Sequence, residues 1–316
     1  MATRQSTRGE GGCLIRRLLL FFGVLIALAV LGAVAFWARP VEFYAAYSEL
    51  RLLRRGAESK TTIVEGYRVH YYALGPSSGP PVVLVHGLGG RAEDWQNLAP
   101  YLTKAGYRVY LPDLPGYGQS EKPASFSYSV SDEAGVVVGF LDALGLKQVN
   151  LGGWSMGGWI VQRVAAQHPD RVGKLMLFDS AGVAMKPDWD TGLFTPANAT
   201  ELSQLDELLM PHPPSVPEFV ASDILRHSKQ NAWVIRRALA SMLTGRDATD
   251  RLLPGLRIPV LIVWGALDRI TPLNEGEMLH RLVAGSQLEV IQGCGHLAPS
   301  QCASQIGPNV VVFLRQ

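Results

Sequence analysis

The stretch VNLGGWSMGGWIVQRVAAQH, residues 149–168, joins a short apolar strand to a helical run through a serine flanked by glycines. The serine, Ser155, lies in a Gly-x-Ser-x-Gly string between Gly153 and Gly157. A serine on a sharp strand-to-helix turn needs small neighbours because its backbone is strained, and the two glycines supply them. The string alone is a weak signal. Its place between a strand and a helix predicts a serine nucleophile whose hydroxyl stands clear of a sheet.

A serine hydroxyl is a poor nucleophile without a base, so one of the seven histidines should lie beside it. His296 follows the last predicted strand in a glycine-flanked loop, where side chains reach the carboxyl edge of a sheet. Asp268 follows the preceding strand and is the predicted orienting acid, with Asp179, after the sixth strand, as the rival. The chain order serine, aspartate, histidine favours Asp268. We expect structural or solvent-exposed roles for the remaining histidines: His70, His86, His168, His212, His227 and His280.

Two backbone N–H groups are predicted to form an oxyanion hole. The helix that follows Ser155 begins at Met156 and directs its free N–H groups toward developing negative charge. The loop HGLGG, residues 86–90, follows a buried strand, and its glycines allow the N–H of Leu88 to turn inward beside that of Met156. His86 is interpreted as a brace of this loop and residues 113–120 as a structural turn. The glycine spacing does not fit a dinucleotide fingerprint, and nothing indicates a metal or organic cofactor.

From residue 61 onward, apolar strands alternate with helical stretches, which predicts an α/β fold with a doubly wound, mainly parallel sheet. Strands are expected at 61–72 (two, around Glu65-Gly66), 81–85, 108–111, 149–151, 175–178, 260–264 and 288–291. Helices are expected at 94–105, 130–144, 156–168, 274–283 and 303–315.

One section, residues 183–253, contains no strand signal. Helices are expected at 200–209, 217–227 and 231–243, with Trp233, Leu239, Met242 and Leu243 on one apolar face. A helical insert after the sixth strand would lie over the carboxyl ends of the strands, where open α/β sheets bind ligands, so it is predicted to be a cap. An ordinary helical subdomain without substrate contact is the alternative.

The N-terminal part of the chain indicates a membrane anchor. Residues 18–38 form 21 consecutive uncharged residues, long enough as a helix to span the hydrocarbon core. A cleaved signal peptide, with residues 33–35 as its cleavage site, is the alternative, but the apolar run exceeds a usual signal. Residues 39–60 are expected to form an amphipathic helix near the interface, or a solvated linker helix. Basic residues flank the span on both sides and leave its orientation weakly specified.

Composition excludes several classes. With 47% hydrophobic and 18% charged residues over 316 positions, the chain is too apolar to be disordered. Residues 1–60 carry nine Lys/Arg against four Asp/Glu, whereas the remaining body is mildly acidic, which argues against a nucleic-acid binder. The three cysteines, Cys13, Cys294 and Cys302, predict neither a disulfide framework nor a zinc site.

Over residues 61–316 the chain resembles the α/β-hydrolase superfamily. The resemblance rests on five motifs in the family's order: His86-Gly87, residues 113–118, residues 153–158, residues 265–268 and Gly295-His296. With its anchor and cap, the whole chain resembles membrane-anchored monoacylglycerol lipases and bacterial membrane phospholipases. The resemblance implies an eight-stranded hydrolase core in two parts, residues 61–182 and 254–316, a helical cap at 183–253 and a basic tail at 1–17.

The activity that the resemblance implies is cleavage of lipid-like carboxylic esters at a bilayer, by the triad Ser155, Asp268 and His296. Carbon–carbon bond hydrolysis or perhydrolysis on the same triad remains an alternative, as does a non-catalytic interaction protein, which usually lacks a triad member.

Overall fold

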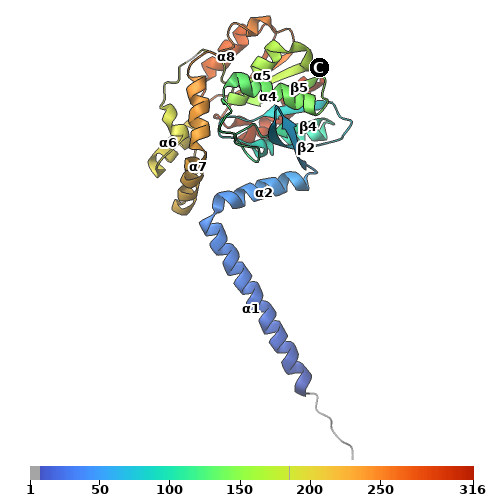
Figure 1. The fold of residues 1–316 in the computed structure, drawn as a ribbon, viewed down its shortest axis with the longest axis vertical. Helices are drawn as coiled ribbons and strands as arrows, with labels where there is room; N and C mark the ends of the chain where they lie inside the picture. The colour runs from blue at the N-terminus through green and yellow to red at the C-terminus, as the bar shows by residue number, and fades with distance from the viewer. Residues whose placement is uncertain (1–7, 185) are drawn as a thin grey trace, which may run out of the picture.

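The computed structural model describes residues 8–184 and 186–316, and its centre is an eight-stranded sheet (Figure 1). The strands are β1 (Glu58–Val64), β2 (Tyr67–Leu74), β3 (Pro81–Val85), β4 (Arg108–Pro112), β5 (Val149–Trp154), β6 (Val172–Phe178), β7 (Val260–Gly265) and β8 (Gln287–Ile291). Their order is β1-β2-β4-β3-β5-β6-β7-β8; β2 pairs antiparallel with β1 and β4, and the other neighbours are parallel. The predicted fold class is confirmed.

Helices cover both faces of the sheet. The helices of the body are α3 (Ala99–Lys104), α4 (Val130–Ala143), α5 (Met156–Gln167), α8 (Leu273–Leu282), α9 (Ala298–Gln301) and α10 (Ala303–Arg315). Residues of α4, α5 and α8 share one buried apolar cluster with one face of the strands, and residues of α3 and α10 share a second cluster with the other face. This two-faced core places the carboxyl ends of the parallel strands at one common edge.

The predicted helix at 94–105 is correct only in its second half. The chain forms a short 3-10 helix (Ala92–Trp95) and then α3, with Pro100 in the first turn of α3. Proline has no N–H to donate and disfavours helical backbone before it, so a helix starts there more readily than it passes through. Trp95 and Leu98 are fully buried between the two pieces.

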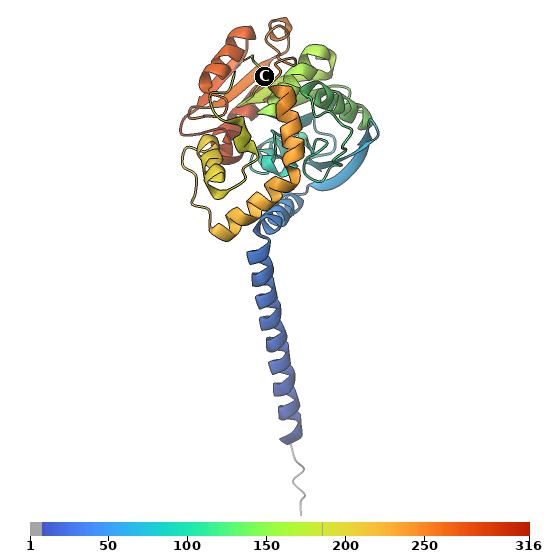
Figure 2. The same ribbon diagram turned by 60° about the vertical axis from the view of Figure 1, so that its left-hand side comes forward.

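The section predicted to be a cap contains α6 (Ala199–Leu209) and α7 (Glu218–Met242). Two of the predicted helices are therefore one helix of 25 residues, which Figure 2 shows bent but unbroken. No glycine or proline separates the two predicted parts. The predicted apolar face is also wrong in part, because Trp233 and Leu243 are 38% and 53% exposed while Val234, Ile235 and Ala238 are buried.

At the N-terminus, α1 (Arg8–Ala38) projects from the body (Figure 1), so the residues of the predicted basic tail that the structure describes are already helical. Its segment Arg16–Ala38 contains an 18-residue window with a mean hydropathy of 2.9 and is exposed along its length, and it is long and apolar enough to cross a membrane. The end of α1 contacts the cap: the rings of Phe36 and Trp37 lie 6.1 and 6.3 Å from that of Phe219 in α7.

The second helix, α2 (Pro40–Arg54), is shorter than the predicted helix at 39–60, whose last three residues begin β1. It is also more than a linker. Leu52 is 0% exposed and belongs to the apolar cluster of α3 and α10, and Ser48 is buried as well. The opposite face exposes Phe43, Tyr44 and Tyr47. The helix therefore has one face in the core of the body and one face free.

Candidate active site

Ser155 lies on the turn between β5 and α5, with backbone angles of φ 54° and ψ −120°. A side chain at the flanking glycines would not fit: a Cβ on Gly153 would come within 2.2 Å of the Gly157 carbonyl, and one on Gly157 within 2.3 Å of the Val85 carbonyl. The strained turn is held by the Ser155 N–H, which donates to the Phe178 carbonyl of β6 at 3.0 Å. The glycines thus permit the turn that lifts the hydroxyl from the sheet edge.

The structure brings the three predicted triad residues together. The Oγ of Ser155 lies 2.9 Å from Nε2 of His296, and Nδ1 of His296 lies 2.8 Å from Oδ2 of Asp268. All three side chains are buried, and they come from the ends of β5, β7 and β8. This chain of hydrogen bonds can take a proton from the serine hydroxyl and hold the resulting imidazolium beside a carboxylate.

The Asp268 carboxylate is fixed by its own loop. Its Oδ1 accepts from the backbone N–H groups of Ile270 and Thr271 at 2.8 and 3.0 Å, and its Oδ2 accepts from the Thr271 hydroxyl at 2.8 Å. The Thr271 hydroxyl also lies 3.2 Å from Nδ1 of His296. Sequence reasoning missed Thr271, although a threonine three residues after an aspartate in a turn is a recognisable pattern.

The rival acid, Asp179, has a different environment. It follows β6 with a positive φ of 43°, and its Oδ1 accepts from the N–H of Gly265 in β7 at 2.6 Å. Burial, together with the nearby charge of Asp268, raises its pKa well above the ordinary value. Among the described residues, His296 makes no hydrogen bond to it, so its geometry is that of a brace between two strand ends.

The loop that carries His296 is tied to the body and to the cap. The indole N–H of Trp154 donates to the His296 carbonyl at 2.7 Å, and the His296 N–H donates to the carbonyl of Leu209, the last residue of α6, at 3.0 Å. Neither contact could be predicted from sequence, because both join segments far apart in the chain.

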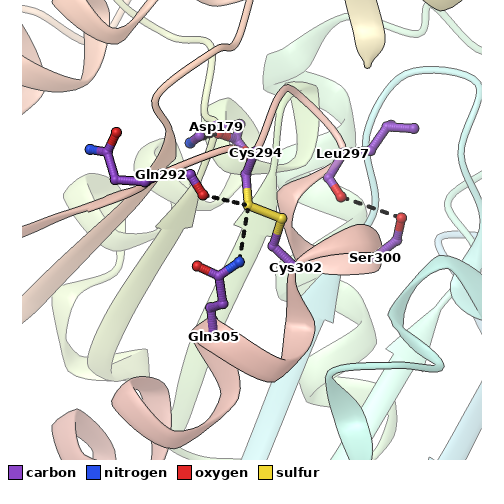
Figure 3. The surroundings of a disulfide bond; sticks show 8 residues. Asp179, Gln292, Cys294, Leu297, Ser300, Cys302 and Gln305 are labelled. Atoms are coloured by element: carbon purple, nitrogen blue, oxygen red, sulfur yellow. Dashed lines mark hydrogen bonds between the residues drawn. A yellow bond between two sulfur atoms is a disulfide. The ribbon is translucent and has the colours of Figure 1, made fainter. Parts of the chain in front are cut away.

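The cysteines predicted no disulfide framework, yet two of them form one disulfide. Cys294 and Cys302 are bonded, which links the loop two residues before His296 to the start of α10 (Figure 3). The short helix α9 folds the intervening chain back and brings the two cysteines together. Because the two lie only eight positions apart, the disulfide closes a small loop around His296.

The oxyanion loop lies against the serine turn. Leu88 and Met156 are both buried, and within the described chain no protein acceptor pairs with either backbone N–H. His86 holds the loop as predicted: its Nδ1 donates to the Gly87 carbonyl at 2.8 Å, and its Nε2 accepts from the Leu114 N–H at 3.1 Å. Burial lowers the pKa of His86, which keeps the imidazole neutral for this pairing.

A further buried pair supports the same region. Nδ1 of His70 donates to Oδ2 of Asp113 at 2.8 Å, and Asp113 also accepts from the N–H groups of Ala92 and Gln119. Burial raises the pKa of Asp113, but the hydrogen bonds outweigh it and the net pKa is lowered. The predicted structural role of this turn agrees with these contacts.

Two cavities meet at Ser155. The first, of about 490 Å³, is lined by His296, by Ile224 and Ile235 of α7 and by Val41 and Tyr44 of α2. The second, of about 300 Å³, runs toward the other end of α7 and is mostly apolar. Leu88 and Phe194 line both. A substrate with two arms could therefore place its reacting carbon at Ser155 and one arm in each cavity.

At the mouth of the first cavity, polar groups join α2 to α7. The buried carboxylate of Asp223 accepts from the Val41 N–H at 2.9 Å and pairs with Arg226, which also donates to Glu42 at 2.9 Å. His227 lies 3.3 Å from Glu42. Glu42, Asp223 and His227 are close enough to share a metal ion, but Arg226 already supplies the positive charge there. We interpret this group as a polar connection between α2 and α7.

Comparison with known proteins agrees with the fold and with the geometry of the site. Residues 80–233 match the family model of the α/β hydrolase fold. The chain is 30% identical over 270 residues to the 2-hydroxy-6-oxononadienedioate/2-hydroxy-6-oxononatrienedioate hydrolase of Escherichia coli O81, covering 78% of this chain and 91% of that one. It is 26% identical over 267 residues to Lipase 1 of Psychrobacter immobilis, covering 80% and 82%.

Among solved structures, a bacterial membrane phospholipase A superposes with a TM-score of 0.80 at 26% identity, over 95% of this chain and 98% of that one. The fold, the nucleophile turn and these similarities define a hydrolase-type protein. The chain belongs to the α/β hydrolase fold family.

Proposed function

We propose that the protein is a membrane-anchored serine hydrolase that cleaves carboxylic esters of lipid-like substrates through an acyl-enzyme. The observation that carries the proposal is the hydrogen-bonded chain from Ser155 through His296 to Asp268 at the junction of two cavities. A monoacylglycerol, a lysophospholipid or a diacyl phospholipid is the substrate class that such an arrangement fits.

In the first step, the Ser155 Oγ attacks the ester carbonyl carbon while Nε2 of His296 takes the hydroxyl proton. The carbonyl oxygen becomes an oxyanion, which the N–H groups of Leu88 and Met156 stabilise. His296 then returns the proton to the departing alcohol and leaves an acyl-Ser155 ester. In the second step, water attacks this ester, His296 takes a proton from the water, and the carboxylic acid is released as Ser155 regains its proton.

The cavity walls support a lipid-like substrate. Val41 and Tyr44 belong to the helix that directly follows α1, and they line the same cavity as Ser155. If α1 spans a bilayer, this cavity approaches the serine from the membrane side, so a substrate could enter it without crossing bulk water. The phospholipase and lipase similarities point to the same substrate class.

The disulfide supports one side of the membrane. Disulfides persist in oxidising compartments and are rare in the cytosol, so the bond between Cys294 and Cys302 supports a catalytic body that lies outside the cytoplasm. Arg16 and Arg17, at the opposite end of the span, would then remain on the cytoplasmic side, an orientation that the nearly even distribution of basic residues around the span permits. Protease added to intact spheroplasts of a bacterial host should remove the body; a protected body would reverse this assignment.

A carbon–carbon bond hydrolase is the second candidate. The Escherichia coli relative is named a 2-hydroxy-6-oxononadienedioate hydrolase, and the match covers most of both chains. The same serine relay could serve it. The helix α1 and the α2 wall of the cavity favour the ester hydrolase.

The test uses the full chain in detergent. A fluorophosphonate probe should label the wild type and not Ser155→Ala, and only the wild type should release fatty acid from a panel of monoacylglycerol, lysophospholipid and diacyl phospholipid. Loss of a triad member typically removes several orders of magnitude in rate. Substantial turnover by Ser155→Ala, or cleavage of a vinylogous diketone but of no ester by the wild type, would contradict the proposal.

A further inference from the structure

The lining of the second cavity includes a buried carboxyl group that the proposed mechanism does not use. The cavity lies between the last turns of α7, with Leu239 and Met242, and a floor that includes Trp159 and Ile270. Glu275, in the first turn of α8, also lines it and is only 9% exposed. A carboxyl group in such a mostly apolar cavity is costly to bury unless something pairs with it.

Within the described residues, no partner accounts for the Glu275 carboxyl group. In the described parts of the chain, no hydrogen bond reaches its carboxyl oxygens and no basic side chain lies within ion-pair distance. It does not cap α8 either, because this helix start has no side-chain cap hydrogen bond and the N-cap residue, Pro272, has no N–H to donate. The carboxyl group is therefore free to pair with whatever occupies the cavity.

Its protonation state suits hydrogen bonding to an uncharged group. Burial, with smaller contributions from the charges of Asp268 and Asp188, raises the pKa of Glu275 to about 8. At neutral pH the group is mainly a carboxylic acid, which has one O–H donor and one carbonyl acceptor. It can bind a hydroxyl or a keto oxygen without the desolvation cost of a buried charge.

The position of His296 indicates which substrate arm enters this cavity. His296 lines the first cavity and is not among the residues around the second. Since His296 must return its proton to the leaving alcohol, the alcohol belongs in the first cavity and the acyl chain in the second.

We propose that Glu275 is a specificity residue that hydrogen-bonds an oxygen substituent on the acyl chain, so that the favoured substrates are esters of hydroxylated or oxo fatty acids. This inference rests on the proposed ester hydrolase function. A group built to pair with a substrate hydroxyl discriminates against the analogue that lacks it, because the group is then left unpaired.

The experiment compares methyl decanoate with methyl hydroxydecanoates that carry the hydroxyl near the carboxyl, in mid-chain or at the far end. The full chain in detergent is used, and released acid is measured by mass spectrometry. We expect at least one hydroxylated ester to exceed decanoate by about tenfold in kcat/KM, the value of one hydrogen bond. Glu275→Met should reduce that ratio to about one, whereas Glu275→Gln, which keeps a donor and an acceptor, should retain most of it.

Glu277→Met is the matched control, because Glu277 is exposed on the same helix, and it should leave the ratio unchanged. If the wild type prefers decanoate to every hydroxylated ester, or if Glu275→Met keeps the tenfold ratio, the inference is overturned. The wild-type ratio decides the matter even if Glu275→Met does not fold. Cleavage of no ester at all would instead refute the proposed function.

Discussion

Replacing Asp268 by asparagine should disable the site without unfolding it, and the hydrogen bonds around the carboxylate show why. Oδ1 accepts from two backbone N–H groups, those of Ile270 and Thr271, so in Asp268→Asn this position must keep the amide oxygen. The amide nitrogen then occupies the place of Oδ2, facing Nδ1 of His296. A nitrogen that can only donate requires Nδ1 to be the acceptor.

The consequence is the wrong imidazole tautomer. With its proton on Nε2, His296 points an N–H at the Ser155 hydroxyl and cannot take the serine proton. In the corresponding change in a serine protease this effect lowers kcat by about 10⁴, equivalent to about 5.4 kcal/mol of activation free energy. The fold should survive the substitution. In the wild type the Thr271 hydroxyl donates to Oδ2 of Asp268, and in the variant it can donate instead to the Asp179 carbonyl, which lies 3.1 Å away.

The assay is hydrolysis of p-nitrophenyl butyrate by the full chain in detergent, with Ser155→Ala as the blank and circular dichroism as the check on folding. Asp179→Asn is the matched control. Asparagine there can still accept from the Gly265 N–H, and burial, which raises the pKa of Asp179, does not oppose an uncharged amide, so activity should change only a few-fold. If Asp179→Asn lost thousandfold while Asp268→Asn stayed within tenfold, the orienting acid would belong to the end of β6.

Three further predictions concern stability and the membrane. Both carboxyl oxygens of Glu133 are buried without a hydrogen-bond partner among the described residues. Burial raises the pKa of Glu133 in the folded state well above the ordinary value that it has in the unfolded chain. The folded state therefore loses stability as the pH rises above that ordinary value. Glu133→Gln should therefore gain stability over wild type in chemical denaturation as pH rises from 4 to 8, and an advantage independent of pH would contradict the reasoning. Cys302→Ser opens the loop around His296 and should lower stability by about 2.5 kcal/mol, seen as a melting point about 4 to 5 °C lower; dithiothreitol should do the same to wild type and nothing to the variant. The full chain should resist carbonate extraction and dissolve only in detergent, and release by carbonate, or an N-terminus just after Ala35, would show that the span is peripheral or processed.

Sequence reasoning predicted best what is local. The strands that form the parallel sheet are short apolar runs. The turn at Ser155 is indicated by its two flanking glycines, where an added Cβ atom would overlap backbone atoms. Element order then places Asp268 and His296 at neighbouring strand ends, because parallel strands share one carboxyl edge. The geometry of those three residues needed no information beyond pattern and topology.

What sequence reasoning missed depends on contacts between distant segments. Nothing near Leu209 indicates that its carbonyl accepts from the His296 N–H, and nothing near Glu275 indicates that a cavity lies beside it. The cysteines were too few for a pattern, and their pairing follows from the fold of α9 between them. The single helix α7 replaced two predicted helices because a polar stretch interrupts the apolar pattern without breaking the backbone.

The segment after the span shows how far such a contact can change an interpretation. By composition, residues 39–60 indicate an amphipathic helix at an interface, and its exposed Phe43, Tyr44 and Tyr47 agree with that. Yet Leu52 on the opposite face is fully buried in the body, and losing a buried leucine side chain costs about 2 to 5 kcal/mol. A chain cut at residue 61 would lose Leu52 together with the first three residues of β1, so the boundary of the catalytic unit lies at about residue 40. The same helix supplies Val41 and Tyr44 to the cavity at Ser155, so the segment that follows the candidate membrane span is also part of the wall of the site.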